Sequence, residues 1–315
     1  MTAPRAGRLM LLDTASLYFR AFFGVPDSVT APDGTPVNAV RGLLDFITRL
    51  VTEYEPTHLA CCWDNDWRPQ WRVDLLPSYK AHRVEAPRTG APDIEEVPDP
   101  LEAQIPVIVA TLEALGIAVV GADHHEADDV IGTLATGAGV PVDIVTGDRD
   151  LFQLIDDDAE VRVLYTARGV GRHERFTCRE VVDKYRVLPS QYADFATLRG
   201  DSSDGLPGVA GIGEKTAAKL LLEYGDLTGI IAASADPHSA MAPGPRRKVL
   251  DAAAYLDVAP KVVAVVRDLD LGDPELALPA APADPEGLAG LQERWGLGSS
   301  VERVAQALDQ VRSQR

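Results

Sequence analysis

Three short apolar runs in this chain each end at an aspartate. They read RLMLLD, HLACCWD and VDIVTGD, and their last residues are Asp13, Asp64 and Asp148. Runs of this kind are typical of strands that are buried on both faces, as in a parallel sheet. Ligands bind beyond the carboxyl ends of such strands, so we expect the three aspartates to meet at one edge of a sheet.

The stretch between residues 124 and 150 brings further carboxylates to this edge. Its acidic residues open an expected helix or follow the third apolar run: Glu126, Asp128, Asp129, Asp148 and Asp150. Their mutual repulsion is costly unless protons or cations neutralise it, and hard divalent metals prefer oxygen ligands of this kind. In the alternative interpretation, the helix carboxylates are solvated at the helix N-terminus, where the helix dipole favours negative charge, and Asp148 is a turn residue.

The order of the apolar segments predicts an α/β fold for the N-terminal part. Strands expected at 8–13, 58–64, 117–120 and 142–145 alternate with helical patterns. This alternation favours a mostly parallel sheet flanked by helices.

Local signals place further elements around this sheet. Thr35 and Pro36 are typical of an N-cap and a first-turn proline, and apolar residues at helical spacing continue to Tyr54. Residues 161–165 and 174–176 are expected to pair as an edge hairpin.

Helix predominates after residue 177, where we place a domain boundary. The expected units are an α/β core over residues 8–176 and a helical region over residues 177–315. A single continuous structure with a helical C-terminal half is an equally good interpretation.

Residues 67–106 differ in character from both neighbours. Cations alternate there with aromatic side chains, namely Trp67, Arg68, Trp71, Arg72, Tyr79, Lys80 and Arg83. This alternation suits a surface that contacts the backbone and stacks on the bases of a single strand. For Arg68 or Arg72 taken singly, a solvated helix followed by a surface loop is an equally good interpretation.

The most informative C-terminal stretch is RGDSSDGLPGVAGIGEKTAAKLLLEY, residues 199–224. Asp201 and Asp204 are three residues apart, so one turn presents both carboxylates together. A glycine-rich hairpin then opens a helix, and together they carry Gly208, Gly211, Gly213, Lys215, Thr216 and Lys219. Such a hairpin grips a phosphodiester backbone without reading bases. A simple helix–turn–helix corner explains the glycines but not the preceding aspartates.

The net charge of −18 at first argues against a nucleic-acid partner. Phosphate binding depends on where the cations lie, however, so clustered Lys and Arg are compatible with DNA. No apolar run is long enough to span a bilayer, and residues 1–7 are too short and polar for a signal peptide. The 3 cysteines have no disulfide or zinc spacing, which fits a reducing cytoplasm.

Taken together, these motifs resemble the 5′-nuclease family, the flap endonucleases and 5′–3′ exonucleases that also form the N-terminal domain of bacterial DNA polymerase I. Six segments carry the resemblance in the family's order: LLDTASLYFRAF, CCWD, YKAHR, EADDVIGTLA, VTGDRDLFQL and GDSSDGLPGVAGIGEKTAAKLL. The resemblance implies a PIN-like core, a helical arch over residues 67–106 and a helix–three-turn–helix motif over residues 190–224. It also implies a standalone bacterial enzyme.

The resemblance assigns nine carboxylates to two divalent metal ions, Mg²⁺ or Mn²⁺. The first ion is assigned Asp13, Asp64, Glu126 and Asp128. The second ion is assigned Asp148, Asp150, Asp201 and Asp204, and Asp129 is placed between the two ions. Two such ions activate the attacking water and stabilise the leaving oxygen. The pocket stays anionic even so, and a phosphate needs nearby cations. Lys80 is the first choice for this role, with Arg83 and Arg20 as second choices.

The resemblance also implies how DNA is held. The expected contacts are Arg68 and Arg72 in the arch and, at the hairpin, Gly208, Gly211, Ile212, Gly213, Lys215, Thr216 and Lys219, where K⁺ is a further candidate ligand. The expected substrate is branched or flapped DNA with a 5′ single strand, cut during replication and repair. A monomer in the cytoplasm is expected.

Two positions depart from the family's pattern. Thr14 follows Asp13 where glycine is usual, and Gly205 follows Asp204 where asparagine is common. Neither change removes a proposed ligand, but Gly205 bears on the geometry of the loop before the hairpin.

Two other classes of function stay open. One is a non-catalytic module that binds branched DNA through the hairpin, although binding alone would gain from fewer acids. The other is a PIN-like ribonuclease, against which the hairpin and the arch both argue.

Overall fold

The centre of the molecule is a six-stranded sheet with the order β5-β2-β1-β6-β7-β8. The computed structural model describes residues 7–88 and 93–313. Strands β5, β2, β1, β6 and β7 run parallel, and β8 pairs antiparallel with β7. The strands are β1 Leu9–Asp13, β2 His58–Trp63, β5 Ala118–Gly121, β6 Val142–Thr146, β7 Val161–Tyr165 and β8 Glu174–Phe176. The predicted parallel sheet and its edge hairpin are confirmed.

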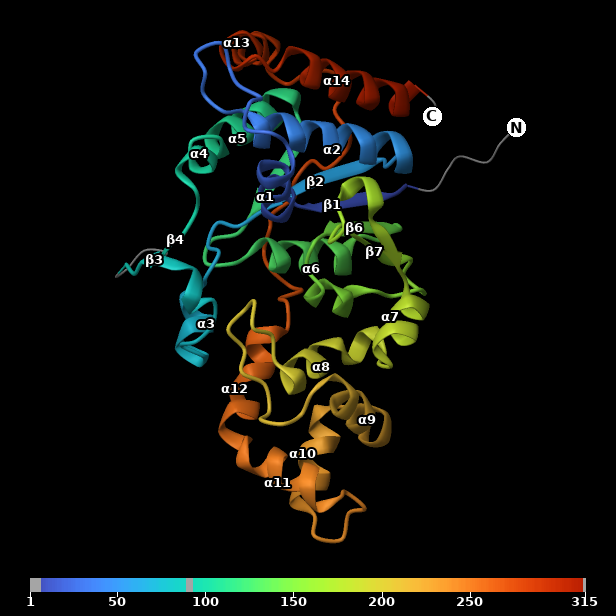
Figure 1. The fold of residues 1–315 in the computed structure, drawn as a ribbon. Helices are drawn as coiled ribbons and strands as arrows, with labels where there is room; N and C mark the ends of the chain where they lie inside the picture. The colour runs from blue at the N-terminus through green and yellow to red at the C-terminus, as the bar shows by residue number, and fades with distance from the viewer. Residues whose placement is uncertain (1–6, 89–92, 314–315) are drawn as a thin grey trace, which may run out of the picture.

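Helices cover both faces of this sheet (Figure 1). Alternate residues of β1 face opposite layers: Leu9 and Leu11 pack with α6, whereas Met10 and Leu12 pack with α2. The elements around the sheet are α1 Thr14–Gly24, α2 Asn38–Tyr54, α5 Ile105–Leu115, α6 Ala127–Gly137, η2 Asp150–Leu154 and η3 Val170–Arg172. Because the central strands β1 and β2 are buried on both faces, their sequences are nearly continuous apolar runs.

Helix α2 begins later than its sequence signal indicates. Its first residue is Asn38, preceded by Val37 without a side-chain cap. Thr35 instead uses its carbonyl to accept a hydrogen bond from the Ala31 amide at 2.8 Å. The prediction that Thr35 is the N-cap is wrong, because Pro36 pairs with Thr30 across this loop and keeps the chain out of the helix.

The segment expected to form a helical arch is only partly helical. Its elements in the described residues are α3 Gln70–Leu75, η1 Ala81–Arg83, β3 Val84–Ala86, β4 Ile94–Glu95 and α4 Asp99–Glu102. Strands β3 and β4 pair antiparallel. Residues 89–92, which also belong to the expected arch, lie outside the described residues.

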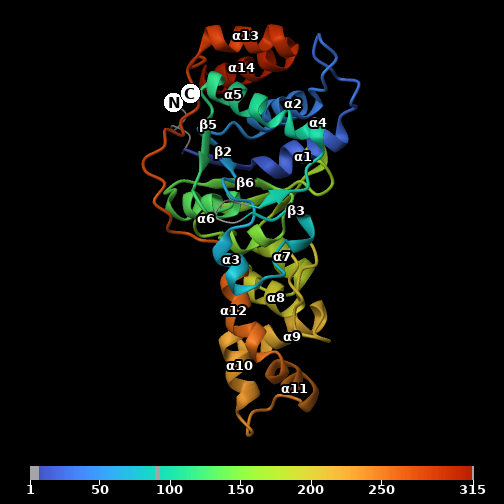
Figure 2. The ribbon, with the colours of Figure 1, turned by 90° about the vertical axis from the view of Figure 1, so that its left-hand side faces the viewer.

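Most of the C-terminal helices form a second body below the sheet (Figure 1). They are α7 Cys178–Tyr185, η4 Pro189–Gln191, α8 Tyr192–Arg199, α9 Glu214–Tyr224, α10 Leu227–Ala235, α11 Pro243–Asp251 and α12 Ala253–Val263. The chain then returns to the sheet, where α13 Pro285–Trp295 packs on α5 and α14 Gly298–Ser313 packs on α2. Figure 2 shows α13 and α14 at the end opposite α10 and α11.

Two further observations concern membrane-spanning helices and the state of the cysteines. Among the helices of the described residues, none has the length and apolar character needed to cross a membrane. Cys61, Cys62 and Cys178 are all free thiols, the first two of them buried.

Candidate active site

Asp13 stands at the junction of the first strand and the first helix. It is the last residue of β1 and the N-cap of α1, where its Oδ1 accepts a hydrogen bond from the Ser16 amide at 3.2 Å. Its Oδ2 accepts another from the Thr146 hydroxyl at 2.7 Å. Since Thr146 ends the neighbouring strand β6, two adjacent strand ends fix the direction of this carboxylate.

Three more carboxylates lie at the same edge. Asp64 follows β2 and accepts a hydrogen bond from the Ala127 amide at 2.7 Å, which ties this strand end to the start of α6. Asp148 follows β6 and accepts one from the Asp150 amide at 2.8 Å. Asp128 lies in the first turn of α6. The prediction that strand ends and α6 bring these side chains together is confirmed.

These side chains surround an open cavity of about 450 Å³. The charged residues that line it are Asp13, Asp64, Lys80, Arg83, Glu95, Glu126, Asp128, Asp148, Arg149 and Asp201. Trp67, Phe19 and Tyr165 contribute aromatic walls. The cavity therefore combines oxygen ligands, three cations and flat apolar surfaces, which together suit a phosphodiester with attached bases.

The crowding of acids raises several pKa values. Burial raises the pKa of Asp13 to about 7, and the charges of Asp64 and Asp148 add to this effect while the hydrogen bond from Thr146 opposes it. Burial also raises the pKa of Asp64. The pKa of Asp128 is raised well above its ordinary value, by burial first and then by Asp148 and Asp13. The carboxylates of the site therefore repel one another when they are ionised, and a bound cation would relieve this repulsion.

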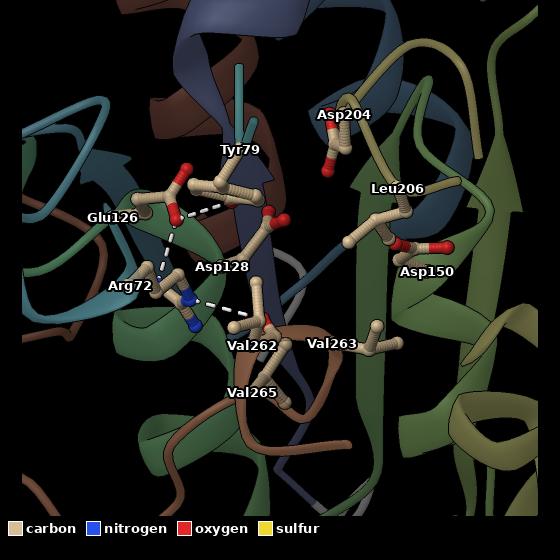
Figure 3. A pocket seen from close by; sticks show the side chains of 10 residues that line it. All are labelled: Arg72, Tyr79, Glu126, Asp128, Asp150, Asp204, Leu206, Val262, Val263 and Val265. Atoms are coloured by element: carbon tan, nitrogen blue, oxygen red, sulfur yellow. Dashed lines mark hydrogen bonds and ion pairs between the residues drawn. The ribbon is translucent and has the colours of Figure 1, made fainter. Parts of the chain in front are cut away.

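Asp128 and Glu126 also line a second, much smaller cavity of about 10 Å³ (Figure 3). Asp150 and Asp204 lie on its other side. Burial, together with the charge of Asp148, raises the pKa of Asp150, and burial raises that of Asp204. The Oδ1 atom of Asp150 is buried and has no hydrogen-bond partner.

These observations test whether the residues fit a divalent metal. Carboxylate oxygens are the donors that Mg²⁺ and Mn²⁺ prefer, and the buried, unpaired oxygen of Asp150 lacks a partner that a cation would supply. Within residues 7–88 and 93–313, no three acidic, His or Cys side chains already converge closely enough to hold an ion. The donor set fits the metal in its chemistry, and binding requires the carboxylates to draw together.

Asp129 does not face the other carboxylates. It is fully buried, and its two oxygens accept hydrogen bonds from Arg72 at 2.7 and 2.8 Å and from the Val266 amide at 2.9 Å. Burial opposes ionisation, but the hydrogen bonds and charge of Arg72, together with the backbone hydrogen bonds from Val266 and Glu126, outweigh it and lower the pKa of Asp129. Arg72 engages both oxygens of Asp129, which lines neither cavity, and the position of Asp129 between two metal ions stays a prediction.

Arg72 and Arg68 are not on a DNA-facing surface, contrary to expectation. Arg72 is 2% exposed and also donates to Glu126 Oε2 at 2.6 Å and to the Val262 carbonyl at 3.1 Å. Arg68 is 9% exposed, donates to the Tyr79 and Pro77 carbonyls and pairs with Asp93. Both predictions fail because buried acceptors use these guanidinium groups.

Lys80 lies where the resemblance implies a cation. Its Nζ atom lines the main cavity and donates to Glu126 Oε1 and to the Trp67 carbonyl. The Tyr79 hydroxyl donates to the other Glu126 oxygen at 2.7 Å. Burial alone would lower the pKa of Lys80, but the charges of Glu126, Asp204 and Asp64 together outweigh burial and raise this pKa well above the ordinary value. Glu126 therefore holds a charged Lys80 in the cavity.

The second-choice cations differ in position. Arg83 lines the cavity, donates to the Ser203 carbonyl at 2.8 Å and pairs with Asp204 at 3.2 Å. Arg20 lies on α1 beside Gly147 and donates to the Ala167 carbonyl at 3.3 Å. Arg83 is thus the better placed of the two.

Asp201 brings two arginines to the site that the sequence interpretation missed. Its Oδ2 pairs with Arg199 at 2.9 Å and with Arg149 at 3.3 Å. Burial would raise the pKa of Asp201, but hydrogen bonds from Ser203 and the two arginine charges outweigh it and lower the pKa. Arg149 stands between Asp148 and Asp150 in the GDRD motif, which was its available signal.

Glu95 is a further missed residue. It ends β4 and lines the cavity together with the aspartates. Burial raises its pKa, while the charges of Arg83 and Lys80 oppose that rise. No sequence signal distinguishes it, since it stands in a loop rich in proline and acids.

The predicted glycine-rich hairpin precedes α9, whose N-cap is Gly213. Gly208 and Gly211 both have positive φ, and a Cβ at Gly208 would collide with the backbone of Arg199. Lys215 and Lys219 are exposed on one face of α9, whereas Ile212 is buried. The hairpin is confirmed, and its contact with DNA stays a prediction.

Lys248 is a cation at the hairpin that the sequence interpretation missed. Its Nζ atom reaches from α11 and donates to the Gly211 carbonyl at 2.8 Å. The ammonium group therefore lies beside the backbone atoms that would face a phosphate.

An acidic cavity at the carboxyl ends of a parallel sheet, joined by an acidic loop to a glycine hairpin, defines an α/β nuclease. Models of the 5′-3′ exonuclease match the chain in two parts: the N-terminal resolvase-like domain over residues 8–186 and the C-terminal SAM fold over residues 187–286. The chain therefore belongs to the 5′–3′ exonuclease family. As a member, it is a 5′ nuclease and hence a hydrolase.

Relatives with high identity agree with this assignment. A 5′-3′ exonuclease of Streptomyces coelicolor is 61% identical over 299 residues, which cover 95% of this chain and 99% of that protein. A 5′-3′ exonuclease of Mycobacterium tuberculosis is 52% identical over 311 residues, covering 96% and 98%. DNA polymerase I of Mycobacterium bovis is 45% identical over 227 residues, which cover 71% of this chain and 24% of that protein.

Solved structures of low identity share the fold. T5 5′-exonuclease with bound zinc ions superposes with a TM-score of 0.62 at 17% identity, covering 96% of this chain and 99% of that one. The catalytic core of Rad2 in complex with DNA substrate gives a TM-score of 0.60 at 16% identity, covering 96% and 92%. The predicted PIN-like fold with a helical C-terminal region is confirmed.

Proposed function

We propose that this 5′ nuclease depends on a divalent metal and removes 5′ flaps and shortens 5′ ends of DNA during replication and repair. The observation that carries the proposal is the acidic cavity, which shares Asp201 with the loop that leads into the glycine hairpin. A duplex held at the hairpin would therefore place its junction at the carboxylates.

The proposed cofactors are Mg²⁺ or Mn²⁺. The residues that would hold them are those whose carboxylates line the two cavities and are not saturated by arginine, namely Asp13, Asp64, Asp128, Asp148, Asp150 and Asp204. When bound, such ions activate the attacking water and stabilise the leaving oxygen of a phosphodiester. Glu126 and Asp201 would not bind the ions directly. Glu126 would position Lys80, and Asp201 would position Arg149 and Arg199.

The protein's own cations orient the phosphate in this proposal. Lys80 and Arg83 both line the main cavity and would contact the scissile phosphate, whose negative charge would otherwise be repelled by the carboxylates. Glu126 keeps Lys80 charged and directed into the cavity. Trp67 and Phe19, in the wall of the same cavity, would stack on bases near the cut.

The hairpin would hold the duplex through its backbone. Lys215, Lys219 and Lys248 place positive charge around exposed peptide groups of Gly211 and Gly213, which fits phosphate contacts without base readout. A K⁺ ion at the hairpin is a further proposed ligand, and it would have to bind carbonyls other than that of Gly211, which accepts from Lys248. We assign DNA binding to α7–α12 and the catalytic core to residues 8–176, and we propose a monomer that acts on chromosomal DNA in the cytoplasm.

The test is a substrate panel with the full-length protein. A 5′-labelled flap DNA, a matched RNA and a nicked duplex are incubated with Mg²⁺, Mn²⁺ or EDTA. We expect size-defined DNA products with either metal, no products in EDTA and little RNA cleavage. RNA products alone would indicate a PIN-like ribonuclease, and a shifted but uncut DNA band in every metal would indicate a binding module.

A further inference from the structure

The segment that carries Lys80 is attached to the DNA-binding body as well as to the catalytic core. We call residues 70–83, from α3 to η1, the bridge segment. Its Tyr79 packs with Leu206, Val262 and Val263 in a separate apolar cluster, which also contains Ala196 of α8. Figure 3 shows Arg72 and Tyr79 of this segment across a small cavity from Asp204 and Leu206. The bridge segment therefore fills the joint between the two bodies.

Backbone contacts fix the bridge segment to the loop at residues 201–206, the acidic loop. The Lys80 amide donates to the Asp204 carbonyl at 2.9 Å, and the Arg83 side chain donates to the Ser203 carbonyl at 2.8 Å. Next to the Lys80–Asp204 bond, Gly205 lies against the Ser78 carbonyl so closely that a Cβ at Gly205 would overlap that oxygen. A side chain at this position would push the two backbones apart.

Lys80 needs this support because its backbone is left-handed. Its φ is 46° and its ψ is 19°, a region that a lysine rarely adopts without help from its surroundings. The hydrogen bond from its amide to Asp204 lies next to the Gly205 contact. The direction of the Lys80 side chain, and hence the place of its Nζ atom in the cavity, is therefore set partly from the acidic loop.

We propose that Gly205 is a positioning residue that couples the DNA-binding body to Lys80. It does so by allowing the acidic loop to approach Ser78, which holds Lys80 in the left-handed conformation that directs Nζ into the cavity. This inference rests on the proposed function, because it assigns a role in the cleavage of flap DNA. Gly205 is not among the residues that line the main cavity, but it lies against the Lys80 amide and follows Asp204, so its effect must pass through these two neighbours.

The variant Gly205→Ala tests the contact, and Gly272→Ala is its matched control. Gly272 has a φ of +66°, close to the +70° of Gly205, but no atom lies within 4 Å of its added Cβ. Both variants carry the same backbone strain, and only Gly205→Ala carries the collision. A second variant, Gly205→Ser, places a different side chain against the Ser78 carbonyl and carries the same collision.

The measurement is a double-mutant cycle with Lys80→Ala, read as single-turnover cleavage of a 5′-flap DNA and as its Kd in EDTA. We expect Gly205→Ala and Gly205→Ser to slow cleavage by up to about a hundredfold, with Kd changed by less than about threefold. Gly272→Ala should cleave like the parent. Lys80→Ala should slow the parent by more than about tenfold but add little in either Gly205 background.

Two outcomes would overturn the inference. One is a cycle in which Lys80→Ala costs the same factor with and without the Gly205 change. The other is cleavage by the Gly205 variants at the rate of the Gly272→Ala control. Thermal melting identifies any variant that fails to fold. If Gly205→Ala does not fold, the cleavage rate of the second Gly205 variant tests the inference. Failure of the unmodified protein to cut the flap DNA at all would instead refute the proposed function.

Discussion

Arg72 shows how a single buried side chain organises the acidic site. It takes Asp129 out of the carboxylate cluster, holds one oxygen of Glu126 and donates to the Val262 carbonyl in α12. Glu126 is then left to hold Lys80 with its other oxygen. The cation that was expected to bind DNA is thus part of the frame that positions the catalytic groups.

Arg72→Ala should therefore destabilise the protein strongly. Removing one partner of a buried ion pair leaves uncompensated charge, which costs about 3–5 kcal/mol. Urea unfolding in EDTA measures the free energy of unfolding of this variant. Arg247→Ala is the control, because Arg247 forms an exposed pair with Asp251 and its loss should have little effect. Equal losses in the two variants would contradict the role of Arg72.

Asp13 gives the metal-free protein a pH-dependent stability. Its pKa is raised from 3.8 to about 7, so the folded protein holds a proton that the unfolded chain releases at lower pH. The resulting stabilisation is present at low pH and is lost as the pH rises through about 7.

The variant Asp13→Asn tests this effect because the amide stays neutral. In EDTA, we expect the Tm of Asp13→Asn to exceed that of the parent by more at pH 8 than at pH 5. Addition of Mg²⁺ at pH 8 should stabilise the parent and narrow the difference. A difference in Tm that is constant between pH 5 and pH 8 would contradict the raised pKa.

At the scale of elements, the strands and their terminal carboxylates were predictable because their signals are local. An apolar run followed by aspartate needs only its own residues to be recognised, and β1, β2 and β6 appear where those runs stand. The glycine hairpin was predictable for the same reason, since Gly208 and Gly211 have the positive φ that makes glycine informative.

The contacts of the arch segment were not predictable, because they depend on partners far away in the chain. Arg68 and Arg72 looked like surface cations, and nothing near them in sequence indicates Asp93 or Asp129. Glu95 reaches the cavity only through the pairing of β3 with β4. The prediction that Thr35 is the N-cap was wrong for a similar reason. Pro36 forms an antiparallel bridge with Thr30, and this pairing outweighs the local preference of Thr35 and Pro36 for a helix start.

Helix α9 carries its own prediction. Lys215 and Lys219 are exposed, lie one turn apart after the hairpin and are proposed to contact phosphates. The double variant Lys215→Ala with Lys219→Ala should lower the slope of log binding constant against log salt by about 0.9 for each lost contact. Fluorescence anisotropy with a nicked duplex measures this slope. Arg312→Ala on α14, at the opposite end of the molecule (Figure 1), should leave it unchanged.

At the scale of the whole molecule, the site is assembled from both bodies. Asp13, Asp64, Asp128 and Asp148 come from the sheet and α6, whereas Asp201 and Asp204 come from the loop before the hairpin. The net charge of −18 is concentrated in part at this cavity, where it serves metal binding. The positive charge needed for DNA lies on the bridge segment and around the hairpin, so the total charge was a poor guide to the partner.

The central claim is that the carboxylates at the edge of the sheet form the site that cleaves a 5′ flap, while the glycine hairpin holds the adjoining duplex. The most direct test compares the parent with Asp148→Asn and Asp128→Asn in single-turnover cleavage of a 5′-labelled flap DNA in Mg²⁺, with Kd for the same DNA measured in EDTA. The account predicts loss of cleavage by orders of magnitude in both variants, with Kd changed by less than about threefold. Incision by both variants at nearly the parent rate would contradict it.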